Sequence, residues 1–172
     1  MKIAFHEIVG SEIVRDIVDD GWFPLDDIEL AAPIGGRLSI KKDGESEADV
    51  SGLLQASVAL PCDRCCRPVQ TTLSVEFDYE CIVGKEAPRT GSDTECREED
   101  CYRIYMNEPV IDLGEILREQ VYLTLPVNVL CQQSCKGLCH QCGADLNQEN
   151  CSCSSADLSS PFAVLRQLKD GD

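Results

Sequence analysis

The sequence predicts an α+β protein with an antiparallel β-sheet or partial barrel, a few helices and a small cysteine-rich module toward the C-terminus. Alternating apolar and polar residues recur through the first half of the chain, which is typical of half-buried strands. A capped helical pattern follows near residue 112, and six of the twelve cysteines fall between residues 131 and 153. We therefore expect a sheet core with helices over residues 1–126 and the cysteine-rich module over residues 127–172.

The N-terminal segment is expected to begin extended over residues 1–8 and to continue into a short helix over residues 12–18. Three apolar side chains of that second stretch share one face at helical spacing, namely Ile13, Val14 and Ile17. A glycine a few residues later is expected to end the helix.

The strands of the sheet are expected over residues 35–42, 48–60 and 68–82. Each stretch carries partial period-two alternation, and the turn-rich sequences DGES and CDRC separate them. Short connections of this kind favour an antiparallel meander. Residues 84–109 are polar and mostly acidic and are longer than a usual tight connection, so we expect a mobile acidic loop there.

A helix is expected directly after that loop. Asp112 and Glu115 form an Asp-x-x-Glu capping pattern ahead of apolar residues at helical spacing. Pro126 is expected to end this helix. A second helix is expected near the C-terminus, where Ser160 and Pro161 occupy cap and first-turn positions before the sequence FAVLRQLK.

The composition indicates where in the cell the protein is located and, from that, what chemical role its cysteines have. Hydrophobic residues make up 43% and charged residues 27% of the chain, close to ordinary globular proportions. No apolar run approaches the roughly 18 residues that span a bilayer, and the N-terminus lacks the pattern of a signal peptide. We expect a cytoplasmic protein with no membrane partner, in which closely spaced thiols are metal ligands or redox groups rather than disulfides.

The strongest motif is the cysteine cluster of the C-terminal module. Cys139, Cys142 and Gly143 have the form of a zinc knuckle, in which two intervening residues let both sulfurs face one ion and the glycine permits a tight turn. A tetrahedral structural zinc site needs two further sulfurs. The first choice of ligands is Cys131, Cys135, Cys139 and Cys142, with Cys151 and Cys153 as alternates.

Other readings of this cluster stay open. Six thiols also suit a two-metal thiolate cluster or an iron–sulfur centre, although zinc is the usual metal for such spacing. Reduced cysteines without a metal are a further alternative. His140 offers a nitrogen ligand, but its place beside Cys139 in the knuckle favours a ring that faces solvent.

A second group, Cys62 and Cys65, lies at the expected turn between two strands. This CxxC is either half of a second zinc site or a redox pair, and the redox reading gives an alternative function as a thiol redox protein or redox-switched chaperone. No helix is expected to begin at the pair, which removes the usual cause of a low thiol pKa. Half a zinc site would be completed by Cys81, Cys96 or Cys101 only if the fold brings one of them close.

Motifs for catalysis are missing from the sequence. His6 and His140 lie far apart in the chain, and there is no glycine-rich phosphate loop or GxSxG elbow. We expect no enzyme, no catalytic residue and no small-molecule substrate.

The net charge of -16 opposes direct binding to a phosphate backbone, so basic proteins are better partners. Direct RNA contact through a zinc ribbon stays an open alternative. It would need a basic stripe assembled by folding from Lys136, Arg103, Arg118 and Arg166.

Four motifs taken in order carry a family resemblance: PCDRC at residues 61–65, CKGLCHQCGADLN at 135–147, CSC at 151–153 and PFAVL at 161–165. Together they resemble the YceD family, also called large ribosomal RNA subunit accumulation proteins or DUF177, over roughly residues 50 to 170. The chain departs from that pattern at His140, where many relatives carry proline, and at Cys66, where a hydrophobic residue is more usual.

The resemblance implies a noncatalytic factor in large ribosomal subunit biogenesis that supports accumulation or processing of large-subunit ribosomal RNA. It implies a ribosomal protein or the pre-ribosomal large subunit as partner. It also implies that zinc stabilises the module rather than providing the shared activity.

Overall fold

The computed structural model describes residues 1–26, 28–84 and 101–153 and divides the chain into two compact units. The first unit comprises Met1–Leu60 and Pro68–Val129, and the second comprises Pro61–Arg67 together with the chain from Leu130 onward. The sequence-based boundary after residue 126 lies near the junction between Val129 and Leu130. The sequence-based division assigns residues 61–67 to the sheet domain, whereas the structure groups them with the cysteine-rich unit.

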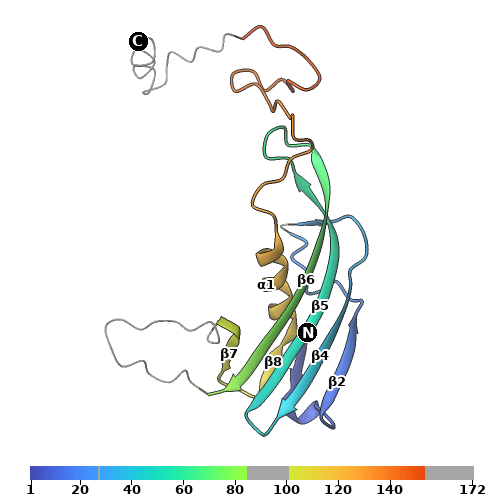
Figure 1. The fold of residues 1–172 in the computed structure, drawn as a ribbon, viewed down its shortest axis with the longest axis vertical. Helices are drawn as coiled ribbons and strands as arrows, with labels where there is room; N and C mark the ends of the chain where they lie inside the picture. The colour runs from blue at the N-terminus through green and yellow to red at the C-terminus, as the bar shows by residue number, and fades with distance from the viewer. Residues whose placement is uncertain (27, 85–100, 154–172) are drawn as a thin grey trace, which may run out of the picture. The chain divides into compact units, whose positions relative to one another are not determined.

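The first unit is built on a six-stranded sheet in the order β2-β4-β5-β6-β7, with β3 paired to β5 (Figure 1). Its strands are β2 (Glu12–Ile17), β3 (Glu29–Leu30), β4 (Gly35–Asp43), β5 (Glu47–Pro61), β6 (Pro68–Val83) and β7 (Arg103–Met106). A separate two-stranded antiparallel sheet pairs β1 (Lys2–Ala4) with β8 (Val110–Asp112). One turn of 3-10 helix, η1 (Phe5–Glu7), follows β1.

The three long strands confirm the expected strand positions to within one or two residues. Inward and outward positions alternate along them, as in β4, where Leu38 and Ile40 are buried while Arg37 and Lys41 are exposed. β2 and β5 both pair antiparallel with β4, whereas β7 runs parallel to β6. The sheet is therefore mixed rather than purely antiparallel.

The helix expected over residues 12–18 is wrong, because the structure forms strand β2 there. Ile13 lies opposite Ile40 and Ile17 opposite Gly36 in the antiparallel pairing with β4. Ile17 is buried while Val14 is 56% exposed, so these two side chains do not share the buried face that a helix would give them; they point to opposite sides of the strand. β-branched side chains favour this extended conformation, and pairing with a neighbouring strand outweighed the short helical pattern.

The acidic segment is more structured at its end than expected. Residues 103–106 form β7, paired in parallel with β6 through Cys81↔Ile104, and β8 begins at Val110. Parallel pairing needs a longer connection than a hairpin does, which accounts for the length between β6 and β7. Residues 85–100 of the expected mobile loop lie outside the described residues, as does the expected terminal helix after Ser160.

The helix expected after Asp112 is confirmed as α1 (Leu113–Thr124). The Asp112 carboxylate accepts hydrogen bonds from the backbone N–H groups of Gly114 and Glu115, at 3.1 and 3.2 Å. Leu125 is the C-cap residue, just before the proline that was expected to end the helix. Within the described residues, no helix combines the length and apolarity needed to cross a membrane.

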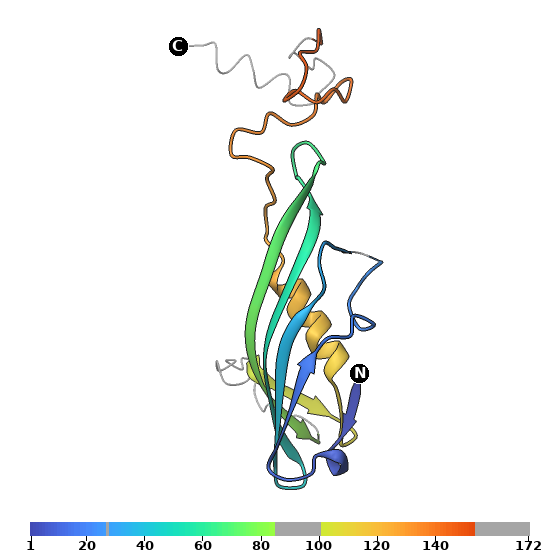
Figure 2. The same cartoon turned by 90° about the vertical axis from the view of Figure 1, so that its right-hand side faces the viewer.

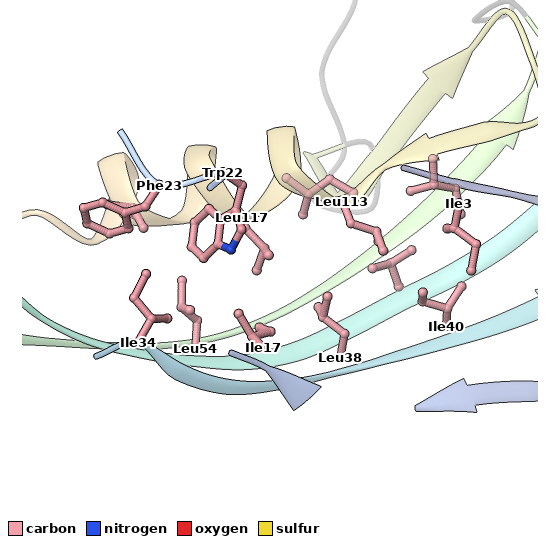
Figure 3. Packing of buried hydrophobic residues seen from close by; sticks show 14 of the residues in the cluster. Ile3, Ile17, Trp22, Phe23, Ile34, Leu38, Ile40, Leu54, Leu113 and Leu117 are labelled. Atoms are coloured by element: carbon pink, nitrogen blue, oxygen red, sulfur yellow. The ribbon is translucent and has the colours of Figure 1, made fainter. Parts of the chain in front are cut away.

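Helix α1 covers one face of the main sheet (Figure 2). Its buried face points toward the inward side chains of the sheet, and Figure 3 shows Leu113 and Leu117 facing Ile17, Leu38 and Leu54. Trp22 and Phe23, from the segment after β2, pack beside the helix with ring centroids 5.8 Å apart. The core therefore lies between α1 and the sheet.

Candidate metal centre

The tip of the β5–β6 hairpin, residues 61–67, forms a tight knuckle. The Cys62 N–H donates to the Arg67 carbonyl and the Cys66 N–H donates to the Cys62 carbonyl, both at 2.8 Å. Cys66 takes a positive φ of 59°, a conformation that L residues seldom adopt. Cys62 and Cys65 are both buried, while Cys66 is exposed.

The C-terminal knuckle has the same backbone hydrogen bonds at the same spacing. The Cys139 N–H donates to the Ala144 carbonyl and the Gly143 N–H donates to the Cys139 carbonyl, again at 2.8 Å. Gly143, with φ of 74°, occupies the place that Cys66 occupies in the first knuckle. The two CxxC motifs are therefore structural equivalents, a similarity that the sequence hides because cysteine replaces glycine at the turn.

The first knuckle meets two cysteines that follow α1 by several residues and so forms a tetrad. The sulfur atoms of this first tetrad all lie within 4.8 Å of one another; its members are Cys62, Cys65, Cys131 and Cys135. The Cys62–Cys135 and Cys65–Cys131 sulfurs are 3.9 and 3.6 Å apart. Four sulfurs at about 2.3 Å from a tetrahedral zinc would lie about 3.8 Å apart, so the spacing fits an ion and not a disulfide.

Arg67 lies against the sulfur atoms of the first tetrad. Its Nε donates to Cys65 Sγ at 3.4 Å and its Nη2 donates to Cys131 Sγ at 3.5 Å. Arg64 supports the same segment, since its Nη1 donates to the Cys135 carbonyl at 2.8 Å. A guanidinium in this position offsets the negative charge that thiolate ligands bring together.

Asn147 contacts another sulfur of the first tetrad, that of Cys135. Its Nδ2 donates to Cys135 Sγ at 3.5 Å, while its Oδ1 accepts the Lys136 N–H at 2.8 Å. Asp145 in turn accepts the Asn147 N–H at 2.9 Å and forms an ion pair with Arg67 at 3.7 Å. The GADLN sequence after the second knuckle thereby supports the first tetrad.

The second knuckle forms a tetrad of its own. The sulfur atoms again lie within 4.8 Å of one another, and the members of this second tetrad are Cys139, Cys142, Cys151 and Cys153. An isolated β-bridge between Leu138 and Asp145 flanks the second knuckle. Cys139 is buried, Cys142 is exposed, and Cys151 and Cys153 are of intermediate exposure.

Hydrogen bonds favour the thiolate form in both knuckles. The Cys131 N–H lowers the pKa of Cys62 to about 6, and Arg67 lowers the pKa of Cys65. The N–H groups of Cys142 and Gln141 lower the pKa of Cys139 to about 6.

Cys131 and Cys153, by contrast, hold their protons more tightly. Burial and the neighbouring sulfur atoms raise the pKa of Cys131 to about 12, and the hydrogen bond with Cys142 together with burial raises that of Cys153 to about 12. A metal that takes all four thiolates therefore displaces protons from each tetrad when it binds.

The structure separates the four first-choice ligands into two pairs. Cys131 and Cys135 lie with Cys62 and Cys65, whereas Cys139 and Cys142 lie with the two alternates, Cys151 and Cys153. The grouping expected from proximity in the sequence is thus replaced by a grouping around each knuckle. Each CxxC turn directs two sulfurs to one side, so each takes its second pair from another segment.

The remaining sequence candidates lie outside both tetrads. Cys81 is fully buried in the sheet core of the first unit, where burial raises its thiol pKa to about 11. Cys101 and His140 are exposed. Cys96 lies outside the described residues. Sequence reasoning missed Arg67, Asp145 and Asn147, and the only signal for them was their place directly after a knuckle.

Two of the cations proposed for a basic stripe have partners within the first unit. Arg103 pairs with Glu80 at 2.7 Å and Arg118 donates to the Trp22 carbonyl at 3.2 Å, both in the first unit. Lys136 belongs to the second unit, and Arg166 lies outside the described residues.

The chain is similar in sequence to a known protein family. The family model described as large ribosomal RNA subunit accumulation protein YceD matches residues 50–169, a range that includes both tetrads. No solved structure shows a significant match to the chain.

Curated relatives from bacteria and plants are similar over parts of the chain. An uncharacterized protein of Mycobacterium tuberculosis is 32% identical over 127 residues, covering 70% of this chain and 56% of the relative. The chloroplastic large ribosomal RNA subunit accumulation protein YCED homolog 1 of Arabidopsis thaliana is 32% identical over 60 residues, covering 35% and 19%. The Zea mays protein of that name is 23% identical over 126 residues, covering 60% and 43%. The chain thus spans between a fifth and just over half of these relatives' lengths.

Proposed function

The chain belongs to the YceD family, and from this premise we propose that it is a noncatalytic factor in large ribosomal subunit biogenesis, supporting accumulation or processing of large-subunit ribosomal RNA. The family match carries this proposal, because it extends over 120 of 172 residues, from 50 to 169, and includes every cysteine of the two tetrads. The relatives from two plants bear the corresponding name.

The metal part of the proposal is a structural zinc ion in the first tetrad. Four thiolates close the coordination sphere and leave no position for a substrate or a reactive water, which favours stabilisation over catalysis. Soft thiolate donors in a tetrahedral arrangement favour zinc over magnesium, calcium or manganese. Such an ion would join the hairpin tip to residues 131–135 and so fold the second unit around it.

The proposed partner is a basic ribosomal protein, either free or within the pre-ribosomal large subunit, in the cytoplasm. The net charge of -16 supports a basic protein surface as the docking site. The engagement of Arg103 and Arg118 within the first unit supports the same choice over a phosphate backbone.

The alternative of a thiol redox protein using Cys62 and Cys65 has less support from the geometry. Their side chains are only 1% and 4% exposed, so a substrate disulfide has little access to either sulfur. Both also belong to a tetrad with metal-site spacing.

Depletion of the protein in its own cells tests the ribosomal role. We expect gradient profiles to show fewer free large subunits and an accumulation of large-subunit RNA precursors, with small subunits unaffected. Restoration of the profile by the wild-type gene is the control. An unchanged large-subunit profile after complete depletion would contradict the proposal.

A further inference from the structure

We propose that Cys139, Cys142, Cys151 and Cys153 bind a second zinc ion, in a mononuclear site that is separate from the first tetrad and exchanges its metal faster. This inference rests on the zinc part of the proposed function and not on its ribosomal part. It concerns how many ions the second unit holds and how firmly it holds each one.

Separate ions follow from the way the eight cysteines divide. Each belongs to one tetrad only, and each tetrad contains one complete CxxC knuckle and one further pair. A two-metal cluster built on fewer than eight thiols would need sulfurs that bridge two ions, and this arrangement requires none. The donor set in each tetrad matches the Cys₄ sites in which zinc is structural.

Charge compensation distinguishes the two sites. A zinc ion with four thiolates carries two net negative charges, and at the first tetrad Arg67 donates to two of the sulfurs. At the second tetrad the described residues supply backbone N–H groups instead, from Gln141 and Cys142 to Cys139 and from Cys153 to Cys151. In the described part of the chain, no arginine or lysine side chain donates to a sulfur of the second tetrad.

Access to solvent points the same way. Three ligands of the first tetrad are buried, with Cys62, Cys65 and Cys135 between 1% and 4% exposed. In the second tetrad only Cys139 is buried, and Cys142 is exposed. A chelator can therefore reach the second ion directly, whereas the first is covered by protein and by a guanidinium that keeps its thiolates in place.

Zinc release to an excess of the chromogenic chelator 4-(2-pyridylazo)resorcinol tests both the number of ions and their order of exchange. The full-length protein is purified without added zinc. We expect two equivalents of zinc in total, with one released in a fast phase and one in a slow phase. Cys142→Ser should remove one equivalent and the fast phase, while Cys66→Ser, which changes an exposed cysteine outside both tetrads, should leave both phases intact.

Arg67→Gln isolates the electrostatic cause while keeping all eight thiols. It should speed the slow phase by about tenfold or more and leave the fast phase unchanged, since outer partners of a metal site typically change affinity by about 10–100-fold. Because both ions are still bound at the start, this variant remains informative even if cysteine variants fold poorly.

Other results of the zinc-release experiment would each overturn a specific part of the proposal. One equivalent of zinc in the wild-type protein would overturn the second site alone, and loss of both equivalents in the soluble Cys142→Ser protein would overturn the separation of the sites. Equal release rates, or a slow phase insensitive to Arg67→Gln, would overturn the order of exchange. Absence of zinc would overturn the metal part of the proposed function as well, and the depletion experiment would still decide the ribosomal part.

Discussion

One residue in each knuckle determines how much backbone strain the turn carries. Cys66 and Gly143 hold the same position and both have positive φ, but only glycine adopts that conformation without a steric penalty. Open space surrounds the position where a Cβ would stand at Gly143, so backbone strain alone decides a substitution there.

Substitution at these two positions should change stability in opposite directions. We expect Gly143→Ala to lower the stability of the second unit by about 1–2 kcal/mol, the usual cost of a left-handed L residue. Cys66→Gly should raise it by up to about 1 kcal/mol, because the strain outweighs the chain entropy that glycine adds. Cys66→Ala is the matched control, since it removes the sulfur and keeps the Cβ. Urea unfolding at fixed free zinc measures all three, and a neutral Gly143→Ala would contradict the turn assignment.

Among the helices and strands, the sequence predicts the ones that are marked by a pattern within a few neighbouring residues. The long alternating strands and the capped helix α1 were found because period and cap lie within a few residues. Strand β2 was missed because six residues are too few to separate a helical from an extended pattern, and β4 decides between them. Strand β7 was missed because its parallel partner lies beyond a long connection.

Asp112 has two roles at the start of α1, which two substitutions can separate. It caps the helix, and it also forms ion pairs with Lys2 at 3.4 Å and with the N-terminal ammonium at 3.9 Å. Asp112→Ala should cost about 1 kcal/mol of stability through the lost cap, while Asp112→Asn should keep the cap and lose only the exposed ion pairs. Urea midpoints at neutral pH compare the variants. An alanine variant as stable as wild type would contradict capping by this carboxylate.

The same carboxylate gives a pH dependence with a defined sign. Burial raises the pKa of Asp112, but the Glu115 N–H and the ammonium of Lys2 outweigh it and hold this pKa below its usual value. A lowered folded pKa means that the contribution is complete above the unfolded pKa of about 3.9 and is lost as pH falls through the folded value. Asp112→Asn should therefore reduce the loss of stability in acid, and an unchanged acid profile would contradict this.

The packing of α1 on the sheet gives a larger effect. Leu117 is fully buried between the helix and the sheet (Figure 3). Leu117→Ala should lower the stability of the first unit by about 2–5 kcal/mol through lost burial and a cavity. Fluorescence of Trp22, the only tryptophan of the chain and a member of the same core, reports this unfolding. Leu123→Ala, at a position 68% exposed, is the control and should change little.

Across the whole molecule, the two units depend on different forces. The first has an apolar core, whereas the second gathers cysteines that lie 66 and 73 residues apart in its first tetrad. The sequence showed that these thiols suit a metal but not how they group, because the hairpin that returns Cys62 and Cys65 to the module is a product of the fold. The CxxC spacing within a knuckle is visible in the local sequence. Which second pair of cysteines joins each knuckle depends on contacts between segments distant in the sequence.

Metal removal should therefore affect the units unequally. Chelation under reducing conditions should unfold the second unit, exposing its thiols to a maleimide reagent, because binding free energy at such sites is folding free energy. Trp22 emission should stay native, since its surroundings belong to the first unit. Loss of the Trp22 signal at the same chelator concentration would contradict independent stabilisation.

The most direct test of the account is the ratio of large-subunit to small-subunit ribosomal RNA in depleted cells that express variants of this chain at equal levels. We predict that wild type and Cys66→Ser restore the ratio, whereas the Cys65→Ser/Cys131→Ser double variant, which removes two ligands of the first tetrad, does not. A ratio that stays normal in depleted cells without any complementing gene would contradict the proposed role in large-subunit biogenesis.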